Sequence, residues 1–206
     1  MVGTSKRSHQ RDGDNEGKNQ KRRSGDKESS GDGELVVYRI LCPDAVIGSV
    51  IGKGGKVINS LRQETHARIK VVDPFPGANK RVITIYCHVK RREPMFDVDE
   101  DLDDIEALCP AQDALLKVHE TIVNALANTE DSDNNHKEEA EILVPSSQAS
   151  NVIGKSGVII KKLRAKTRAN IKVIPKDPSN ATHSCAMSFD NFVQVKYAYL
   201  HHFDES

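Results

Sequence analysis

The chain has 206 residues, equal numbers of basic and acidic side chains (30 each), 37% hydrophobic residues and no tryptophan. It contains no apolar run of about 18 residues, which excludes a membrane-spanning helix, and its polar N-terminus excludes a secretory signal. Its four cysteines, Cys42, Cys87, Cys109 and Cys185, never form a Cys-x-x-Cys pair, so we expect reduced thiols, an intracellular protein and no metal site.

Residues 1–33 are polar and basic, with Val2 as the single hydrophobic residue after the initiator. Such a segment cannot bury enough apolar surface to offset its ordering entropy, so we predict a disordered arm. Basic clusters at 6–7 and at 18–23 have the spacing of a bipartite nuclear-import signal, which predicts a nuclear protein. The alternative is a solvated basic arm without a targeting role.

An internal repeat follows the arm. A shift of 102 residues aligns 40–72 with 142–174 without a gap, and Val-Ile-Gly-Lys occurs in both copies, at 50–53 and at 152–155. This period is far longer than that of a solenoid repeat, so the pattern indicates a duplicated domain.

The first copy is predicted to contain three strands and three helices. Pro43 suits the first turn of a helix, and Gly52 suits the end of that helix. Residues 88–110 form an acidic insertion before a last amphipathic helix. The expected elements, in chain order, are strand 35–42, helix 43–51, helix 56–65, strand 67–72, strand 82–86 and helix 111–128.

Residues 50–58 and 152–160 resemble the K-homology (KH) signature Val-Ile-Gly-x-x-Gly-x-x-Ile. The chain is similar to plant relatives of the poly(C)-binding and heterogeneous nuclear ribonucleoprotein K proteins. This resemblance implies an α+β fold of two type I KH domains, each with βααββα order and a three-stranded antiparallel sheet packed on three helices. The first domain would span 34–128 and the second 139–195, joined by an acidic linker at 129–138.

The second copy departs from the family pattern after Val195. Residues 196–206 lack the spacing of an amphipathic helix and are too few for a stable one, so we predict a non-family tail and a second KH domain without its last helix. The departure favours a retained intron or an alternative, C-terminally truncated isoform. We expect the missing helix to expose the strands that carry Ile142, Ile171 and Val193.

The Gly-x-x-Gly loops are the predicted binding sites. Without a Cβ the backbone can approach a phosphate closely, and the following helix directs its N-terminal amides at the anion. KH domains hold about four nucleotides in this way and read unstacked bases beside the loop. The candidate RNA-binding residues of the first domain are Ile47, Gly48, Ile51, Gly52, Lys53, Gly54, Gly55, Lys56, Arg62, Ile69, Lys70, Val71 and Arg81. Those of the second are Val152, Ile153, Gly154, Lys155, Ser156, Gly157, Arg164, Ile171, Lys172 and Val173. Asn191 stands where the first domain has Arg81.

Several alternatives stay open. Ile47, Ile51, Ile69 and Val71 can instead be core residues, and Arg62 and Arg164 can be solvated helix residues. Residues 142–176 contain eight lysines or arginines and no acid, which indicates a polyanion partner or simply a solvated face. Residues 149–156 also match a relaxed phosphate-binding loop of nucleotide hydrolases. We predict no enzyme, because no buried strand precedes that loop.

The predicted function is therefore binding of single-stranded, pyrimidine-rich RNA, in nuclear mRNA processing or post-transcriptional regulation. Single-stranded DNA is a possible second ligand, and the acidic insertion is a possible site for protein partners, which leaves a protein-interaction scaffold as the runner-up. No cofactor and no membrane are expected.

Overall fold

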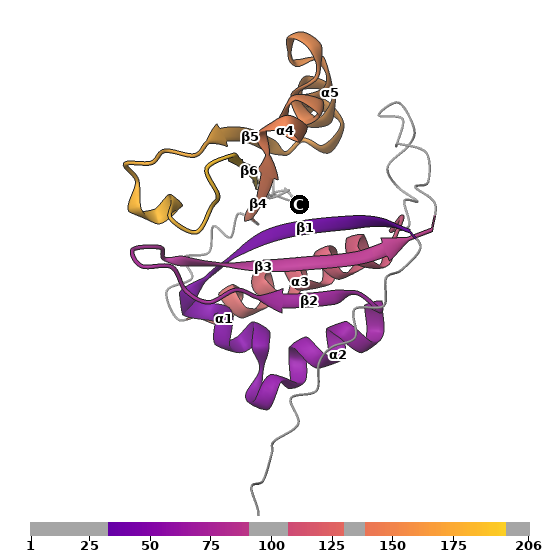
Figure 1. Cartoon of the computed structure of the whole chain (residues 1–206), viewed down its shortest axis with the longest axis vertical. Helices are drawn as coiled ribbons and strands as arrows, with labels where there is room; N and C mark the ends of the chain where they lie inside the picture. Colours follow the sequence, from indigo (N-terminus) through magenta and orange to yellow (C-terminus); the bar gives the residue numbers. More distant parts are fainter. Residues whose placement is uncertain (1–32, 91–106, 130–138, 197–206) are drawn as a thin grey trace, which may run out of the picture. The chain divides into compact units, whose positions relative to one another are not determined.

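The computed structural model describes residues 33–90, 107–129 and 139–196 (Figure 1). The predictions of a disordered arm, an acidic linker and a non-family tail concern residues that lie outside these ranges except for one terminal residue each, and most of the acidic insertion also lies outside them. No helix among the described residues is long and apolar enough to cross a membrane.

The first repeat has the predicted order of elements. Strand β1 pairs with β3 along its whole length and β2 pairs with the other side of β3, all antiparallel, while the three helices pack on one face of this sheet (Figure 1). The third strand is longer than 82–86, since its pairing with β1 continues to Glu34. The elements are β1(Glu34–Pro43), α1(Asp44–Ile51), a 3-10 turn η1(Lys53–Gly55), α2(Lys56–Thr65), β2(Arg68–Val71), β3(Lys80–Val89) and α3(Pro110–Ala127).

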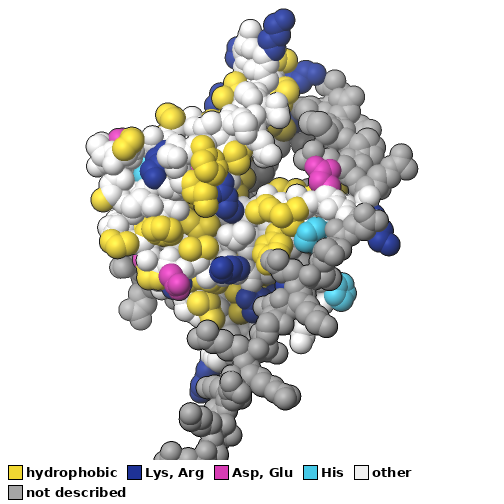
Figure 2. Space-filling model, viewed as in Figure 1, with side chains coloured by type: hydrophobic (Ala, Val, Ile, Leu, Met, Phe, Trp, Pro, Cys, Tyr) yellow, Lys and Arg dark blue, Asp and Glu magenta, His cyan; other side chains and the backbone are white. Residues whose placement is uncertain are grey.

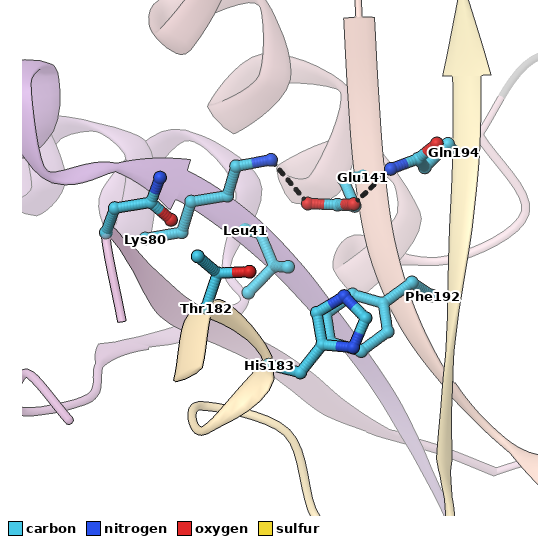
Figure 3. A pocket seen from close by; sticks show the side chains of 8 residues that line it. Leu41, Lys80, Glu141, Thr182, His183, Phe192 and Gln194 are labelled. Atoms are coloured by element: carbon cyan, nitrogen blue, oxygen red, sulfur yellow. Dashed lines mark hydrogen bonds and ion pairs between the residues drawn. The ribbon is translucent and has the colours of Figure 1, made fainter. Parts of the chain in front are cut away.

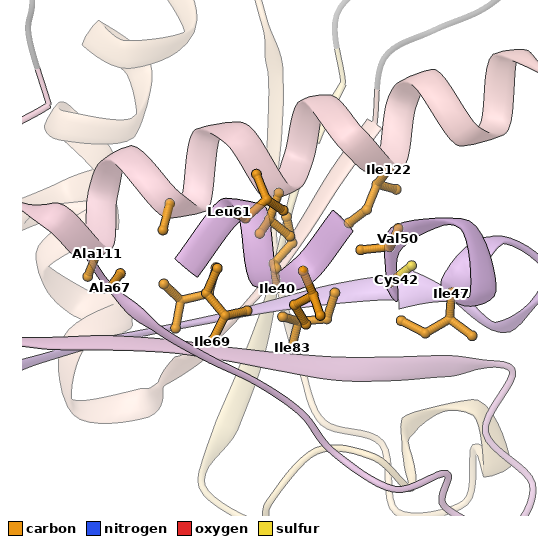
Figure 4. Close-up of a cluster of buried hydrophobic side chains, with 14 of the residues drawn as sticks. Ile40, Cys42, Ile47, Val50, Leu61, Ala67, Ile69, Ile83, Ala111 and Ile122 are labelled. Carbon is orange, nitrogen blue, oxygen red and sulfur yellow. The ribbon is translucent and has the colours of Figure 1, made fainter. Parts of the chain in front are cut away.

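The core of the first repeat lies between α3 and the sheet (Figure 4). Ile40, Ile83 and Ile85 point from the strands to the helices and are at most 2% exposed. Helix α3 contributes small and β-branched residues at helical spacing, from Ala111 to Ile122, so its backbone can approach the sheet closely. Each fully buried aliphatic side chain of this size contributes about 1.5–3 kcal/mol to folding.

The second repeat repeats the same topology up to its third strand, β6. Its sheet has the order β4-β6-β5, again antiparallel, and two helices cover one face. The prediction that the last helix is missing concerns the residues after β6, which lie outside the described ranges. The elements are β4(Glu139–Pro145), α4(Ser146–Ile153), η2(Lys155–Gly157), α5(Val158–Thr167), β5(Asn170–Pro175), η3(Ala181–His183) and β6(Asp190–Lys196).

The expected exposure of the second sheet is wrong in detail. Ile171 and Val193 are 7% and 4% exposed and Ile142 is half-buried, because they pack in a small core with Ile160 of α5 and Ala169, which directly precedes β5. The exposure falls on the helices instead: Val152 and Leu163 are only half-buried, whereas their first-repeat equivalents are buried beneath α3.

The two sheets are continuous, a feature that the sequence did not predict. Strands β1 and β4 pair antiparallel where Ile40 faces Ile142, giving a six-stranded sheet with the order β2-β3-β1-β4-β6-β5. A separate apolar cluster lies on the sheet's other face, away from the helices. It contains Leu41 and Val82 of the first repeat with Leu143, Cys185, Ala186 and Phe192 of the second.

Candidate nucleic-acid interface

Each Gly-x-x-Gly segment forms a tight turn between two helices. Gly52 ends α1 with φ of 75°, and the amide of Gly55 donates a hydrogen bond to the Gly52 carbonyl over 2.9 Å. A Cβ at Gly52 would lie 2.5 Å from Cγ2 of Val57, so this position needs glycine for its conformation and for its packing. Gly154 repeats the arrangement with φ of 72° against Ile159.

The two residues inside each turn project into solvent. Lys53 and Gly54 are exposed, as are Lys155 and Ser156. Gly54 and Ser156 are both left-handed, with φ of 63° and 54°, so this position tolerates a side chain. Helix α2 begins at Lys56, directly after the turn, so its N-terminal amides adjoin these residues. The turn therefore combines an exposed cation with the positive end of a helix.

A surface made by α1 and β2 adjoins the first turn. Gly48 is exposed on α1, and a Cβ there would have no described atom within 4 Å. Ile51 and Val71 are half-buried, and Lys70 is exposed. Ile47 and Ile69 are 9% and 3% exposed, so both side chains belong mainly to the core and support this surface from below.

Arg62 connects α2 with the edge strand β2. Its Nε donates to the Ile69 carbonyl over 2.9 Å, its Nη2 donates to the same oxygen, and its Nη1 donates to Oδ1 of Asn59 over 2.8 Å. Asn59 was not among the predicted site residues; its position one helical turn before Arg62 is the signal in the sequence. The guanidinium is thus held in place at the rim of the surface rather than freely solvated.

Arg164 makes the equivalent bond in the second repeat, from Nε to the Ile171 carbonyl over 2.9 Å. Beside it, Ile171 is buried, Val173 is half-buried and Lys172 is exposed, while Ile153 on α4 is 37% exposed. The two candidate surfaces therefore share one construction.

The surfaces differ at the end of the loop between the second and third strands. Arg81 donates from Nε and Nη2 to the Val72 carbonyl, over 3.0 and 2.8 Å. Asn191 instead donates to Oγ of Ser146 over 3.0 Å. The second surface thus has a short neutral side chain where the first has a guanidinium.

Basic side chains cluster on helix α5 of the second repeat. Figure 2 shows Lys and Arg side chains projecting around α5. On this helix Lys161, Lys162, Arg164 and Lys166 are all exposed. The described residues hold no group of three or more His, Cys, Asp or Glu side chains that could bind a metal ion.

The geometry does not suit a nucleotide hydrolase. The residues that match the relaxed phosphate-binding loop begin at Ala149, and Ala149 to Ile153 belong to helix α4. In a phosphate-binding loop these residues form the loop itself, between a strand and a helix. Here only Lys155–Gly157 form a turn.

The comparisons with known proteins agree with this construction. The family model "KH domain" matches residues 37–93 and 139–196. A KH domain-containing protein of Arabidopsis thaliana is 48% identical over 202 residues, covering 95% of this chain and 32% of that protein. The Arabidopsis RNA-binding KH domain-containing protein RCF3 is 30% identical, covering 78% of this chain and 25% of its own length. Human RNA-binding protein Nova-2 is 27% identical over 73% of this chain and 30% of its own length. The chain thus spans about a third or less of these relatives.

Proposed function

Because this chain belongs to the KH-domain family, we propose that it binds single-stranded, pyrimidine-rich RNA through its two Gly-x-x-Gly turns. The observation that carries the proposal is the pair of turns themselves. Each places an exposed lysine and a helix N-terminus beside a half-apolar surface that a held arginine borders. We propose a binding role and no catalysis.

The arrangement suits a single strand better than a duplex. The turn contacts a phosphate chain from one side, and the surface beside it is apolar enough to receive unstacked bases. The RNA-binding relatives RCF3 and Nova-2 support this assignment by their family membership. Single-stranded DNA offers the same phosphates and bases without the 2′-hydroxyl, so it is the natural competitor to test.

The preference for pyrimidines rests on size and on hydrogen-bond donors. Gly48 leaves room for a base, but the aliphatic side chains of Ile51 and Val71 limit that room. Cytosine presents the acceptors O2 and N3, which the guanidinium of Arg62 and the ammonium of Lys70 can meet. A purine would need a wider surface and offers a different pattern of acceptors.

The test is a competition assay with the full chain and a labelled poly(C) probe. We expect poly(C) to compete more strongly than poly(A), and both more strongly than duplex RNA. Binding should weaken linearly on a log–log plot against salt, with a slope of about −0.7 for each phosphate neutralised. Equal competition by poly(A) and poly(C) would contradict the pyrimidine preference, and binding that no salt concentration changes would contradict the phosphate contacts.

We further propose that the protein acts in the nucleus, in mRNA processing or post-transcriptional regulation. The support is the pair of basic clusters at 6–7 and 18–23. Replacing the second cluster by alanine in a fluorescent fusion should move the protein to the cytoplasm. An unchanged distribution would contradict this part of the proposal.

A further inference from the structure

The two repeats meet around a local twofold axis. Ile40 and Ile142, which are equivalent in the repeat, face each other across β1 and β4. The register within each repeat extends the equivalence, since Lys80 pairs with Pro43 and Asp190 pairs with Pro145. Lys80 and Asp190 therefore occupy the same position in the two repeats. Arg39 and Glu141 also correspond, because each directly precedes its central isoleucine.

Two ion pairs cross between the repeats at these positions. Arg39 donates from Nη1 and Nη2 to the carboxylate of Asp190, over 2.7 and 2.5 Å. Lys80 donates to Glu141 over 2.6 Å. Each carboxylate also accepts a second hydrogen-bond partner. The Met187 amide donates to Asp190 over 2.9 Å, and Gln194 donates to Glu141 over 2.7 Å, the latter shown in Figure 3.

The two pairs differ in exposure. The side chain of Asp190 is 0% exposed and that of Arg39 is 14% exposed, so this pair is almost fully removed from water. Lys80 is 31% exposed and borders a cavity of about 150 Å³ that Glu141 also lines (Figure 3). Because water weakens the attraction between charges, breaking the pair of Arg39 and Asp190 should destabilise the interface more than breaking the pair of Lys80 and Glu141.

Apolar contacts continue the interface on the same face of the sheet. Leu41 and Val82 of the first repeat pack with Leu143 and Phe192 of the second, and the segment before β6 covers them with Cys185 and Ala186. The ring of His183 stacks on Phe192 with centroids 4.2 Å apart (Figure 3). We call this surface the inter-repeat joint; it consists of Arg39, Leu41, Lys80, Val82, Glu141, Leu143, Asp190 and Phe192.

Together with the local twofold axis, the signs of these charges determine which repeats can pair. The two ion pairs are equivalent by symmetry, but the first repeat supplies both cations and the second supplies both carboxylates. If a first repeat paired with another first repeat, Arg39 would face Lys80. If two second repeats paired, Glu141 would face Asp190. Either arrangement would bury like charges without partners, which is strongly destabilising.

We propose that the inter-repeat joint is a charge-selective interaction surface that pairs a first repeat with a second repeat and rejects pairing between like repeats. The joint holds the two repeats of one chain as a single structural unit. It also discourages the association of separate chains through β1 or β4, because every such pairing of like repeats is repulsive. The proposal is independent of what the protein binds.

The test uses three variants of the full chain. The all-acid variant carries Arg39→Asp and Lys80→Glu, and the all-base variant carries Glu141→Lys and Asp190→Arg. The full-reversal variant carries all four changes, so that both ion pairs are re-formed with opposite sign. The control variant reverses the pair of Lys196 and Glu139, which lies within the second repeat with 39% and 37% of the side chains exposed.

The readout is amide hydrogen exchange. In the all-acid and all-base variants we expect exchange at Ile142, Cys185 and Ala186 to accelerate by about a hundredfold, as befits the loss of a buried ion pair. Protection at Ile83 and Ile85 should remain, because these residues lie in the first repeat's own core. The full-reversal and control variants should exchange like the parent chain. Exchange in the full-reversal variant as fast as in the all-acid variant would overturn the proposal.

A second measurement addresses selectivity between chains. All four charged positions of the joint, 39, 80, 141 and 190, are acidic in the all-acid variant and basic in the all-base variant. Light scattering should show each variant alone as a monomer, and an equimolar mixture of the two as a heterodimer that high salt dissociates. A mixture that stays monomeric, or a heterodimer that also forms with the control variant, would show that the charges do not select the partner.

Discussion

The most direct test of the proposed RNA contact changes the exposed pair inside the first turn, Lys53 and Gly54, to aspartate. The turn itself should survive this change. Both positions are exposed, and a Cβ at Gly54 meets no described atom within 4 Å. Gly54 has φ of 63°, where a non-glycine residue costs about 1–2 kcal/mol and aspartate is among the best tolerated. This cost is small beside a typical stability of about 5–15 kcal/mol.

The expected loss of RNA affinity follows from the charge change. Lys53→Asp changes the local charge by two units and Gly54→Asp by one, which gives three in total. A unit charge about 4 Å from a phosphate interacts by about 1 kcal/mol in water, so three correspond to about 3 kcal/mol. That is roughly a hundredfold in the dissociation constant. The slope of log affinity against log salt should also become shallower by about 0.7, for one lost phosphate contact.

The assay is fluorescence anisotropy with a labelled single-stranded RNA at fixed salt, with the melting temperature recorded for each variant. A matched control with the same charge change combines Lys90→Asp and Asn124→Asp, both exposed and away from the turn. The control should bind RNA within about threefold of the parent, since screening weakens exposed charges beyond about 10 Å. If the control and the turn variant lose affinity equally, net charge rather than the turn governs binding.

Further predictions concern the first turn, a buried thiol and the spacing of the two candidate surfaces. Gly48→Ala should stabilise α1 by about 0.5–1 kcal/mol yet weaken RNA binding, because the added methyl group enters the free space beside the turn. Gly52→Ala should instead destabilise the first repeat by about 2–4 kcal/mol, because of the φ of 75° at this position and the contact with Val57. Chemical denaturation measures both stabilities and anisotropy measures RNA binding; unchanged binding by Gly48→Ala contradicts the assigned surface. Burial, and next the nearby Asp44, raise the pKa of the Cys42 thiol to about 12, so the folded state holds this proton more tightly than the unfolded chain and folding stability falls as the pH rises from about 9 towards 12. Thiol labelling at pH 8 should spare Cys42 in the folded protein and modify the half-buried Cys109 first. Rapid labelling of Cys42 without unfolding would contradict its burial. Strands β2 and β5 form opposite edges of the six-stranded sheet, five inter-strand spacings or roughly 24 Å apart. An RNA with two pyrimidine motifs should therefore bind more tightly than an RNA with one motif when a long spacer separates the two, and no more tightly when they are adjacent. Anisotropy with a series of spacer lengths measures this difference.

The sequence predicts the local structure of each repeat well, because the responsible signals are local. Pro43 and Gly52 mark the ends of α1, and the left-handed turn that follows needs glycine at a fixed spacing. The fold class and both Gly-x-x-Gly turns could therefore be derived from short segments that occur twice. The roles of Arg62 and Asn59 are less accessible, since their partners depend on how α2 meets β2.

The inter-repeat joint could not be derived in the same way. Its residues come from β1, β3, β4 and β6, and no local pattern states that β1 pairs with β4. One partial signal exists: Leu41 and Leu143 alternate with Ile40 and Ile142, so both faces of β1 and β4 are apolar. A strand with two apolar faces indicates cover on both sides, and only the structure shows that each repeat supplies cover for the other.

The joint also bears on the unequal construction of the two repeats. The first repeat buries Val46, Val50 and Leu61 beneath α3, and every buried member of its core comes from its own residues, with Ile142 of the second repeat packed against it. The described part of the second repeat has no such helix, and its own core contains only Ile160, Ala169, Ile171 and Val193 as buried members. As many of its buried hydrophobic residues lie on the opposite face, where Leu143 and Phe192 pack with Leu41 and Val82. The dependence is therefore asymmetric: opening the joint removes a large part of the second repeat's buried surface, while the first repeat keeps its own core. Because β5 and Arg164 build the second candidate surface on that smaller core, we expect opening the joint to disturb the second turn and to leave the first turn in place.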